Sequence, residues 1–161
     1  MSNIRKQLRN LDVSKLRMKT GRTVENELKH HASILYDCIL EEMDDSIYSA
    51  YSPKVYMRNF NLYNALRIND MIKVSTKDSS LYVELYFDED DVMHENFLGE
   101  RVDVANILNE GYRTHGSFAD VPMLGFRDAT KFIDNGILRY KQKVANPFKV
   151  KLNINNEERI F

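Results

Sequence analysis

The stretch TVENELKHHASILYDCILEEMDDSI, residues 23–47, decides the fold, because it predicts a long amphipathic helix. From Val24 its apolar residues recur mostly every three or four positions, as on one face of a helix: Leu28, Ala32, Leu35, Ile39, Met43 and Ile47. Thr23 is typical of a helix N-cap, because its hydroxyl accepts a backbone amide that lacks a partner. We predict about six or seven turns, ending before Pro53, since the residue that precedes a proline is disfavoured in a helix.

A basic segment precedes this helix. Residues 1–22 contain seven basic side chains: Arg5, Lys6, Arg9, Lys15, Arg17, Lys19 and Arg22. Apolar Ile4, Leu8 and Leu11 follow helical spacing within it. Two interpretations remain open, a frayed terminus or an arm that docks on a neighbouring subunit or on phosphate. We expect residues 23–161 to form one domain.

Strand patterns follow the helix. Residues 81–87 alternate between two faces, with Leu81, Val83, Leu85 and Phe87 on one and Tyr82, Glu84 and Tyr86 on the other. Such alternation is typical of a half-buried strand. Residues 70–75 form a second β-rich run, and the polar residues 76–80 lie between the two runs. A β-hairpin is therefore predicted.

The C-terminal half predicts two further helices and a strand. A short helix over 102–109 is expected to stop at Gly111 as a left-handed C-cap. A loop over 112–126 leads to a second long helix, from Phe126 to near Lys143, and 148–154 alternates like a strand that joins the hairpin. This order predicts an α+β fold with a long N-terminal helix. Its helices pack on one face of a small, mostly antiparallel sheet made of the hairpin and the C-terminal strand.

Composition is that of an ordinary globular domain. The 161 residues are 43% hydrophobic and 29% charged, with a net charge of −1, so no global basic excess favours nucleic acid. The single cysteine, Cys38, excludes an internal disulfide. The polar start lacks the apolar core of a signal peptide, and no window reaches the roughly 18 apolar residues of a membrane helix. We expect a soluble protein of a reducing cytoplasm, with no membrane contact.

The strongest candidates for chemistry are the four consecutive carboxylates DEDD, residues 88–91. Metal-binding carboxylates converge from separate elements, whereas four in a row splay apart, so we favour a solvated turn on a loop that closes the strand. His30 and His31 point about 100° apart on a helix and cannot share a metal. With Cys38 expected to be buried and unreactive, we predict no enzyme, no cofactor and no metal.

The segment YSPKVYMRNFNLYNALRI, residues 51–68, supplies a resemblance. Its motif residues are Tyr51, Pro53, Tyr56, Arg58, Asn59 and Leu62, which run into Ala65-Leu66-Arg67-Ile68. This arrangement resembles a motif in the neck and tail-completion proteins, or head–tail connectors, of tailed bacteriophages. The segment 104–111 is similar to that family's short helix, which ends in an acidic residue and glycine. The chain departs from the family at Asn59-Phe60 and at Pro122-Met123.

The resemblance implies a structural protein that forms a ring of its own copies, hexameric or twelve-fold, at the phage neck or tail top. Its implied partners are a connector or adaptor protein above and a tail terminator, tube or sheath protein below. Genome DNA would pass through the lumen without specific binding. The implied location is the virion, assembled in the cytoplasm of the host bacterium, in a contractile phage or a phage-tail-like particle.

Candidate subunit contacts follow from the resemblance and from the enrichment of aromatic and arginine side chains at interfaces. They are Tyr51, Pro53, Tyr56, Arg58, Leu62, Tyr63, Glu110, Gly111 and Tyr112. An equally open interpretation is that Pro53 and Tyr56 fix the corner between helix and strand. The acidic residues Asp88, Glu89, Asp90 and Asp91 are candidates for lining the lumen, where they would repel phosphate.

Two other functions remain as alternatives. A small nucleic-acid-binding module would use the basic arm 1–22, and its affinity for duplex DNA would fall steeply with salt. A hydrolase or metal enzyme built around Asp88–Asp91 with His94 would lose activity in Asp90→Asn.

Overall fold

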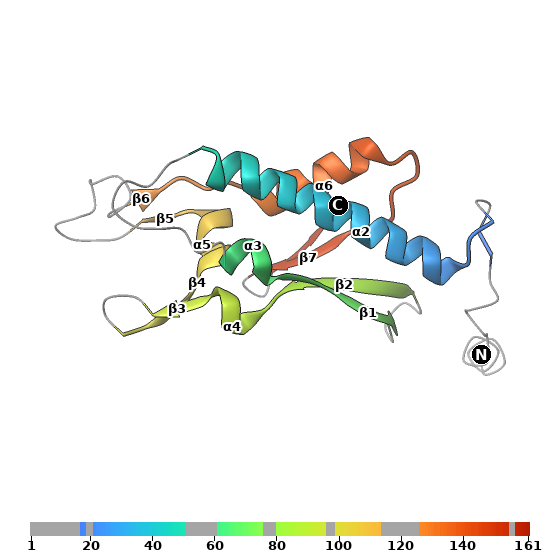
Figure 1. Ribbon diagram of the computed structural model, residues 1–161, viewed down its shortest axis with the longest axis horizontal. Coiled ribbons are helices and arrows are strands. Elements are labelled where there is room, and N and C mark those ends of the chain that lie inside the picture. Colours follow the sequence, from blue (N-terminus) through green and yellow to red (C-terminus); the bar gives the residue numbers. More distant parts are fainter. Residues whose placement is uncertain are drawn as a thin grey trace.

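Two long helices lie side by side along the long axis of the molecule, and a β-hairpin lies below them (Figure 1). They are α2 (Val24–Met43) and α6 (Phe132–Lys143), and the hairpin consists of β1 (Leu66–Val74) and β2 (Leu81–Phe87). The computed structural model describes residues 17–18, 21–50, 61–75, 80–95, 99–113, 126–154 and 157–161. The predicted α+β class is confirmed.

Short elements complete the fold. The helical ones are η2 (Asp44–Tyr48), α3 (Asn61–Ala65), α4 (Glu89–Val92) and α5 (Val104–Glu110). The strands are β3 (Met93–Glu95), β4 (Arg101–Asp103), β5 (Tyr112–Arg113), β6 (Phe126–Arg127), β7 (Lys151–Ile154) and β8 (Glu157–Ile160). Within the described ranges the strands form four antiparallel pairs, β1–β2, β3–β4, β5–β6 and β7–β8.

The long N-terminal helix forms as predicted. The Thr23 hydroxyl oxygen accepts the Asn26 N–H at 3.2 Å and caps α2. The helix continues through one π-helical turn, η2, and ends at Tyr48. Its buried face carries Ala32, Cys38, Ile39 and Met43, with Ile47 of η2, so the periodic stripe was a correct guide to the core.

The core lies between α2, α6 and the hairpin. Met43, Phe132, Ile137 and Tyr140 have almost no exposed surface. Gly136 of α6 sits directly against α2, because a Cβ built on it would lie 2.8 Å from Ile39 Cα. The two helices therefore approach closely only because this position has no side chain.

The hairpin begins earlier than the strand predicted at 70–75. Leu66 faces Phe87 and Ile68 faces Leu85 across the ladder, and the register shifts between Asn69 and Lys73. Leu66 belongs to the core, and Leu85 and Phe87 pack against it. The alternation read from 81–87 therefore gave the correct inner face of β2.

The second long helix begins at Phe132, and its predicted start at Phe126 is wrong. Phe126 belongs to β6, and Lys131 adopts a left-handed backbone with φ 54°. The Thr130 and Lys131 N–H groups donate to the carbonyls of Leu108 and Asn109, at 3.1 and 3.0 Å. These residues satisfy the C-terminal end of α5 and are unavailable to a helix of their own.

Two predicted loops contain regular structure. Asp88 is the N-cap of α4, so residues 89–92 form a helical turn where a loop was expected. Strands β3 and β4 pair directly after this turn. Strands β5 and β6 pair at the two ends of the loop predicted over 112–126. Carboxylates 88–91 favour this start of a helix, because acidic side chains suit the first turn.

The C-terminal strand does not join the hairpin. Strand β7 pairs with β8, placing Lys151 opposite Ile160. Two backbone hydrogen bonds between Val150 and Phe161, at 2.9 and 3.3 Å, extend this ladder by one pair. The prediction failed because residues 157–160 supply a nearer partner, and a local hairpin costs less loop entropy than a distant pairing.

Candidate functional site

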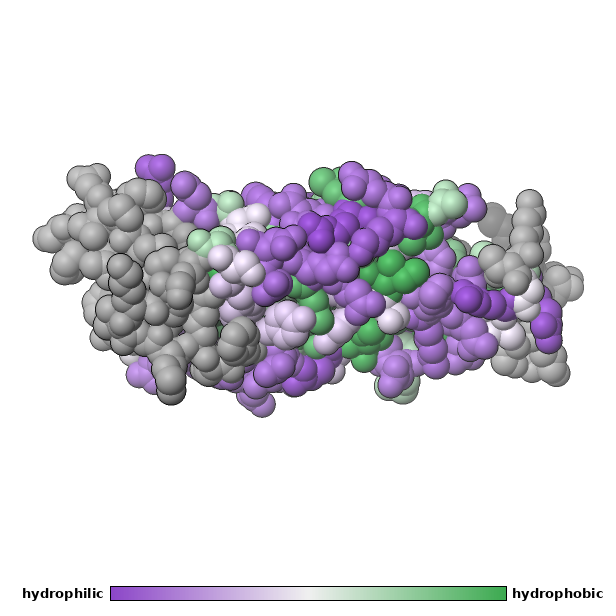
Figure 2. Space-filling view, turned by 45° about the horizontal axis from the view of Figure 1, so that its top comes forward, coloured by the Kyte–Doolittle hydropathy of each residue, from purple (hydrophilic) through white to green (hydrophobic). Residues whose placement is uncertain are grey.

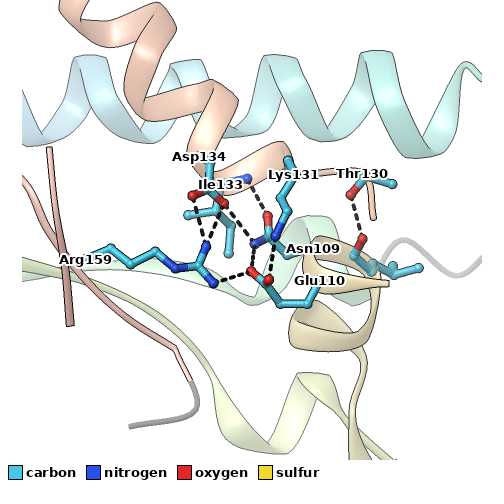
Figure 3. A network of polar contacts seen from close by, with 8 residues as sticks. Asn109, Glu110, Thr130, Lys131, Ile133, Asp134 and Arg159 are labelled. Carbon is cyan, nitrogen blue, oxygen red and sulfur yellow. Dashed lines mark hydrogen bonds and ion pairs between the residues drawn. The ribbon is translucent and has the colours of Figure 1, made fainter. Parts of the chain in front are cut away.

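The best-defined polar site lies where α5 ends and α6 begins (Figure 3). We call it the α5–α6 junction, and it consists of Asn109, Glu110, Lys131, Asp134 and Arg159. These residues come from the end of α5, the start of α6 and strand β8. The junction therefore links three segments that are far apart in the sequence.

Asn109 is the centre of the junction. It is fully buried, and its Oδ1 accepts the Ile133 N–H at 2.9 Å. Its Nδ2 donates to Glu110 Oε1 at 2.7 Å and to Asp134 Oδ2 at 3.1 Å. Lys131 provides no side-chain cap for α6. Asn109, from another helix, therefore satisfies an N-terminal amide that would otherwise lack a partner.

Glu110 is held ionised by the cations around it. Arg159 Nη2 lies 3.0 Å from Glu110 Oε1, and Lys131 Nζ contacts Glu110 Oε2. Burial alone would raise the pKa of Glu110, but hydrogen bonds from Arg159, Lys131 and Asn109 lower it to about 2. A carboxyl with such a pKa does not exchange protons near neutral pH, so it serves as a fixed anchor and not as an acid or base.

The charges of the junction balance. Arg159 Nη1 also lies 3.1 Å from Asp134 Oδ1, so two carboxylates face two cations. A balanced and mutually bonded set positions its own backbone elements. The junction is therefore a brace that fixes α5, α6 and β8 relative to one another.

An open hollow adjoins the junction. It is lined by Glu110, Gly111, Tyr112, Arg113, Asp128 and Ala129. Gly111 caps α5 with φ 76° and ψ 175°, so the positive φ is confirmed, but ψ lies far from the left-handed helical region. The structure thus places three predicted interface residues, Glu110, Gly111 and Tyr112, at one surface feature. Their role in subunit contacts stays a prediction.

The tyrosine-bearing segment, residues 51–68, is described only from Asn61 onward. Tyr51, Pro53, Tyr56 and Arg58 lie outside the described residues. Its two other candidates lie in α3, where Leu62 is buried in the core and Tyr63 is half-buried.

Tyr63 is held from the end of the long helix. Its N–H donates to the Tyr48 hydroxyl oxygen at 3.2 Å, and the two rings meet edge to face. Leu62 and Tyr63 thus fix the entry into β1, which fits the interpretation that this region forms a corner.

The acidic residues 88–91 separate into distinct roles. Asp88 Oδ1 accepts the Asp90 N–H at 3.1 Å, and Asp91 Oδ2 lies 3.1 Å from Arg67 Nη2. Glu89 and Asp90 are exposed. Among the described residues no cluster of three or more metal-binding side chains occurs. The proposed place of residues 88–91 in the lumen of a ring stays a prediction.

His31 and Cys38 take structural positions. The Tyr140 hydroxyl lies 2.7 Å from His31 Nδ1 and accepts the Phe148 N–H at 2.9 Å, which fastens the segment before β7 to α2. Burial lowers the pKa of His31, opposed by nearby Glu27. Cys38 is buried, as predicted, and burial raises the pKa of its thiol, which disfavours the reactive thiolate.

The hairpin carries most of the exposed apolar side chains. Four of the seven large hydrophobic side chains that the described residues expose belong to it: Met71 (70%), Val74 (61%), Tyr86 (45%) and Tyr82 (39%), of which the two tyrosines face away from the core. By contrast, Figure 2 shows that the face formed by the helix layer is mainly hydrophilic, with hydrophobic residues in small separate areas. Within the described ranges, no helix meets the length and hydropathy needed to cross a membrane.

Sequence reasoning missed most of the junction. Glu110 was singled out, but Asn109, Lys131, Asp134 and Arg159 were not. Asp134 in the first turn of a helix is a recognisable signal. Nothing in the sequence links Arg159 to a glutamate 49 positions earlier.

The comparisons decide the family. The YomN family model matches residues 2–153, which is nearly the whole chain. The chain belongs to the YomN family. YomN is a phage-derived family, from Bacillus prophage, which is consistent with the predicted bacteriophage origin. Searches of curated proteins and of solved structures gave no match. The YomN match ends inside β7, so Arg159 of the junction lies beyond it.

Proposed function

We propose that this YomN protein is a non-enzymatic virion-assembly protein that forms a ring at the phage neck or tail top. The proposal rests on the phage-derived family and on the resemblance of the 51–68 and 104–111 motifs to neck and tail-completion proteins. The order of helix, hairpin, short helix, long helix and C-terminal strand is also that of the resemblance. Its location would be the virion, after assembly in the host cytoplasm.

The observation that carries the proposal is the exposed hairpin. Exposed apolar side chains scattered singly are normal, whereas their concentration on one element marks an interaction surface. Here they concentrate on β1 and β2, while the junction fixes α5, α6 and β8 relative to one another. A domain with one exposed apolar element, here the β1–β2 hairpin, suits repeated contacts between identical copies.

A ring needs heterologous contacts that close by rotation, so two different surfaces of each subunit must fit each other. Tyr51, Tyr56, Arg58 and Tyr63 are proposed for one surface, together with the rim formed by Glu110, Gly111 and Tyr112. The proposed partners are a connector or adaptor protein on one side and a tail terminator, tube or sheath protein on the other. DNA would pass without specific binding.

The test is the mass of the purified protein across concentration, combined with electron microscopy of the largest species. Closed rings of one size, formed alone or on addition of a connector protein, are the expected result. A protein that stays monomeric at every concentration and with the connector present, yet binds duplex DNA through its basic arm, would overturn the proposal and favour the nucleic-acid alternative.

A further inference from the structure

The hairpin has an outer face that the core does not use. Leu66, Leu85 and Phe87 turn inward. Because side chains alternate along a strand, the outer face consists of Arg67, Asn69 and Lys73 of β1 and Tyr82, Glu84 and Tyr86 of β2. Tyr82 lies opposite Lys73, and Tyr86 lies opposite Arg67.

The cations of this outer face are already neutralised. Lys73 pairs with Glu84, and Arg67 pairs with Asp91 of α4 at 3.1 Å, which also places α4 beside the face. The exposed charges that remain on β1 and α4 are the carboxylates of Asp70, Glu89 and Asp90. The outer face is therefore an aromatic surface with an acidic border.

The N-terminal arm has the complementary chemistry. Residues 1–22 contain seven basic side chains and one acidic one, whereas the rest of the chain contains sixteen basic and twenty-three acidic ones. The net charge of −1 thus conceals a strongly positive arm and a negative body. Ile4, Leu8 and Leu11 add apolar side chains at helical spacing, which suit an aromatic surface.

We propose that the first part of the arm of one copy, residues 1–16 with four of its seven basic side chains, binds the outer face of the hairpin of a second copy. The inference rests on the proposed assembly of several copies and names the contact that joins them. The arm leaves its own body at Arg17, which bridges to Thr23 at the start of α2. Helix α2 packs on β1 and β2 from the core side, opposite the outer face. An arm-to-face contact between copies is heterologous, as a ring requires.

The first experiment measures self-association of the full-length chain by analytical ultracentrifugation, at low and high salt. We compare the face variant Tyr82→Ser/Tyr86→Ser, the arm variant Arg5→Ser/Lys6→Ser/Arg9→Ser and the control Leu138→Ser, which removes a side chain of similar exposure (49%) from α6. Face and arm variants are expected to raise the dissociation constant at least about tenfold, with the control unchanged. High salt is expected to weaken association of the unmodified chain, because exposed charges are screened.

The second experiment asks whose arm occupies the face. Equal amounts of ¹⁴N- and ¹⁵N-labelled protein are mixed and treated with a lysine cross-linker, and links from Lys6 or Lys15 to Lys73 are analysed by mass spectrometry. Links between differently labelled copies are expected. Links found only within one copy would overturn the inference.

The two proposals fail in different ways. Association that survives both the face and the arm variants, with circular dichroism showing them folded, overturns the arm contact and leaves the ring standing. An arm variant that loses only DNA binding also overturns the arm contact. Absence of any association, with or without a connector protein, overturns the ring itself.

Discussion

The middle of α6 and its first turn are held in different ways. At Gly136 and Ile137 the helix packs against α2 without polar contacts and with no space for one additional carbon. At Phe132–Asp134 it is held by Asn109 of another helix and by Arg159 of a strand near the C-terminus. The position of the middle of α6 thus depends on close packing against α2, whereas the position of its first turn depends on hydrogen-bond and ion-pair partners.

This difference explains why α6 was only half predictable. Apolar periodicity reports the face of a helix that meets the core, and the buried Phe132, Ile133, Ile137 and Tyr140 all lie within the helix predicted from Phe126 to near Lys143. Periodicity carries no information about hydrogen-bond partners, which decide where the helix starts. Substitutions in the two regions are therefore expected to differ in size, in pH dependence and in salt dependence.

The largest effect is expected at the helix crossing. In Gly136→Ala the new Cβ would lie 2.8 Å from Ile39 Cα, a backbone atom that cannot rotate away. The helices must separate, and we expect the free energy of unfolding to fall by about 3 kcal/mol despite alanine's better helix propensity. Urea denaturation measures this loss. Asn135→Ala, next in sequence and exposed, is the control and should leave stability unchanged or slightly raised.

The next largest effect is expected at Asn109. In Asn109→Ala the Ile133 N–H and the Asp134 carboxylate lose a buried partner, and we expect a loss of about 2 kcal/mol. Asn109→Asp keeps an acceptor for the amide but adds a carboxylate next to Glu110 and Asp134. Its stability should therefore improve relative to the unmodified chain as the pH falls. Equal stability of Asn109→Ala and the unmodified chain would show that the brace is unnecessary.

Local signals explain which parts of the fold followed from the sequence. The Thr23 cap, the α2 stripe and the inner face of β2 each depend on neighbours within a few positions. The candidate site depends instead on side chains that meet across long separations. Arg159 pairs with Glu110. The Thr130 hydroxyl donates to the Leu108 carbonyl, so Thr130 binds the end of α5 and does not begin α6.

The outer face of the hairpin could be predicted from the sequence only in part. Alternation predicted that Tyr82 and Tyr86 turn away from the core. The pairing of Arg67 with Asp91 could not be predicted from the sequence, because the residues of α4 were expected to form a loop.

The third prediction concerns pH. Glu110 has a pKa of about 2 in the folded chain against its usual 4.5, so its ion pairs stabilise the fold fully above pH 4.5, and this stabilisation is lost as the pH falls towards 2. In Arg159→Gln the pKa of Glu110 should rise. The difference in urea midpoint from the unmodified chain is then largest at pH 5–7 and narrows towards pH 2. A difference that stays constant with pH would assign the effect to packing. Lys149→Gln, an exposed neighbour of β7, is the control.

The smallest effect is expected at Arg139, whose guanidinium contacts three carboxylates. Arg139 Nη1 lies 3.0 Å from Glu41 Oε2, and its Nη2 lies 3.0 Å from Asp45 Oδ2 and contacts Glu42. Glu41 and Asp45 are exposed to water and salt, so Arg139→Gln should cost only about 0.5 kcal/mol, falling towards zero in roughly 1 M salt.

The Arg139→Gln experiment completes the comparison, because the same substitution at Arg159 removes a cation from a more buried set of carboxylates. We expect the urea midpoint of Arg159→Gln to respond more weakly to added salt, since less exposed pairs are screened less. Equal salt responses of the two variants would contradict the junction's role as a brace. They would mean that its ion pairs behave as surface pairs, leaving Asn109 alone to position the first turn of α6.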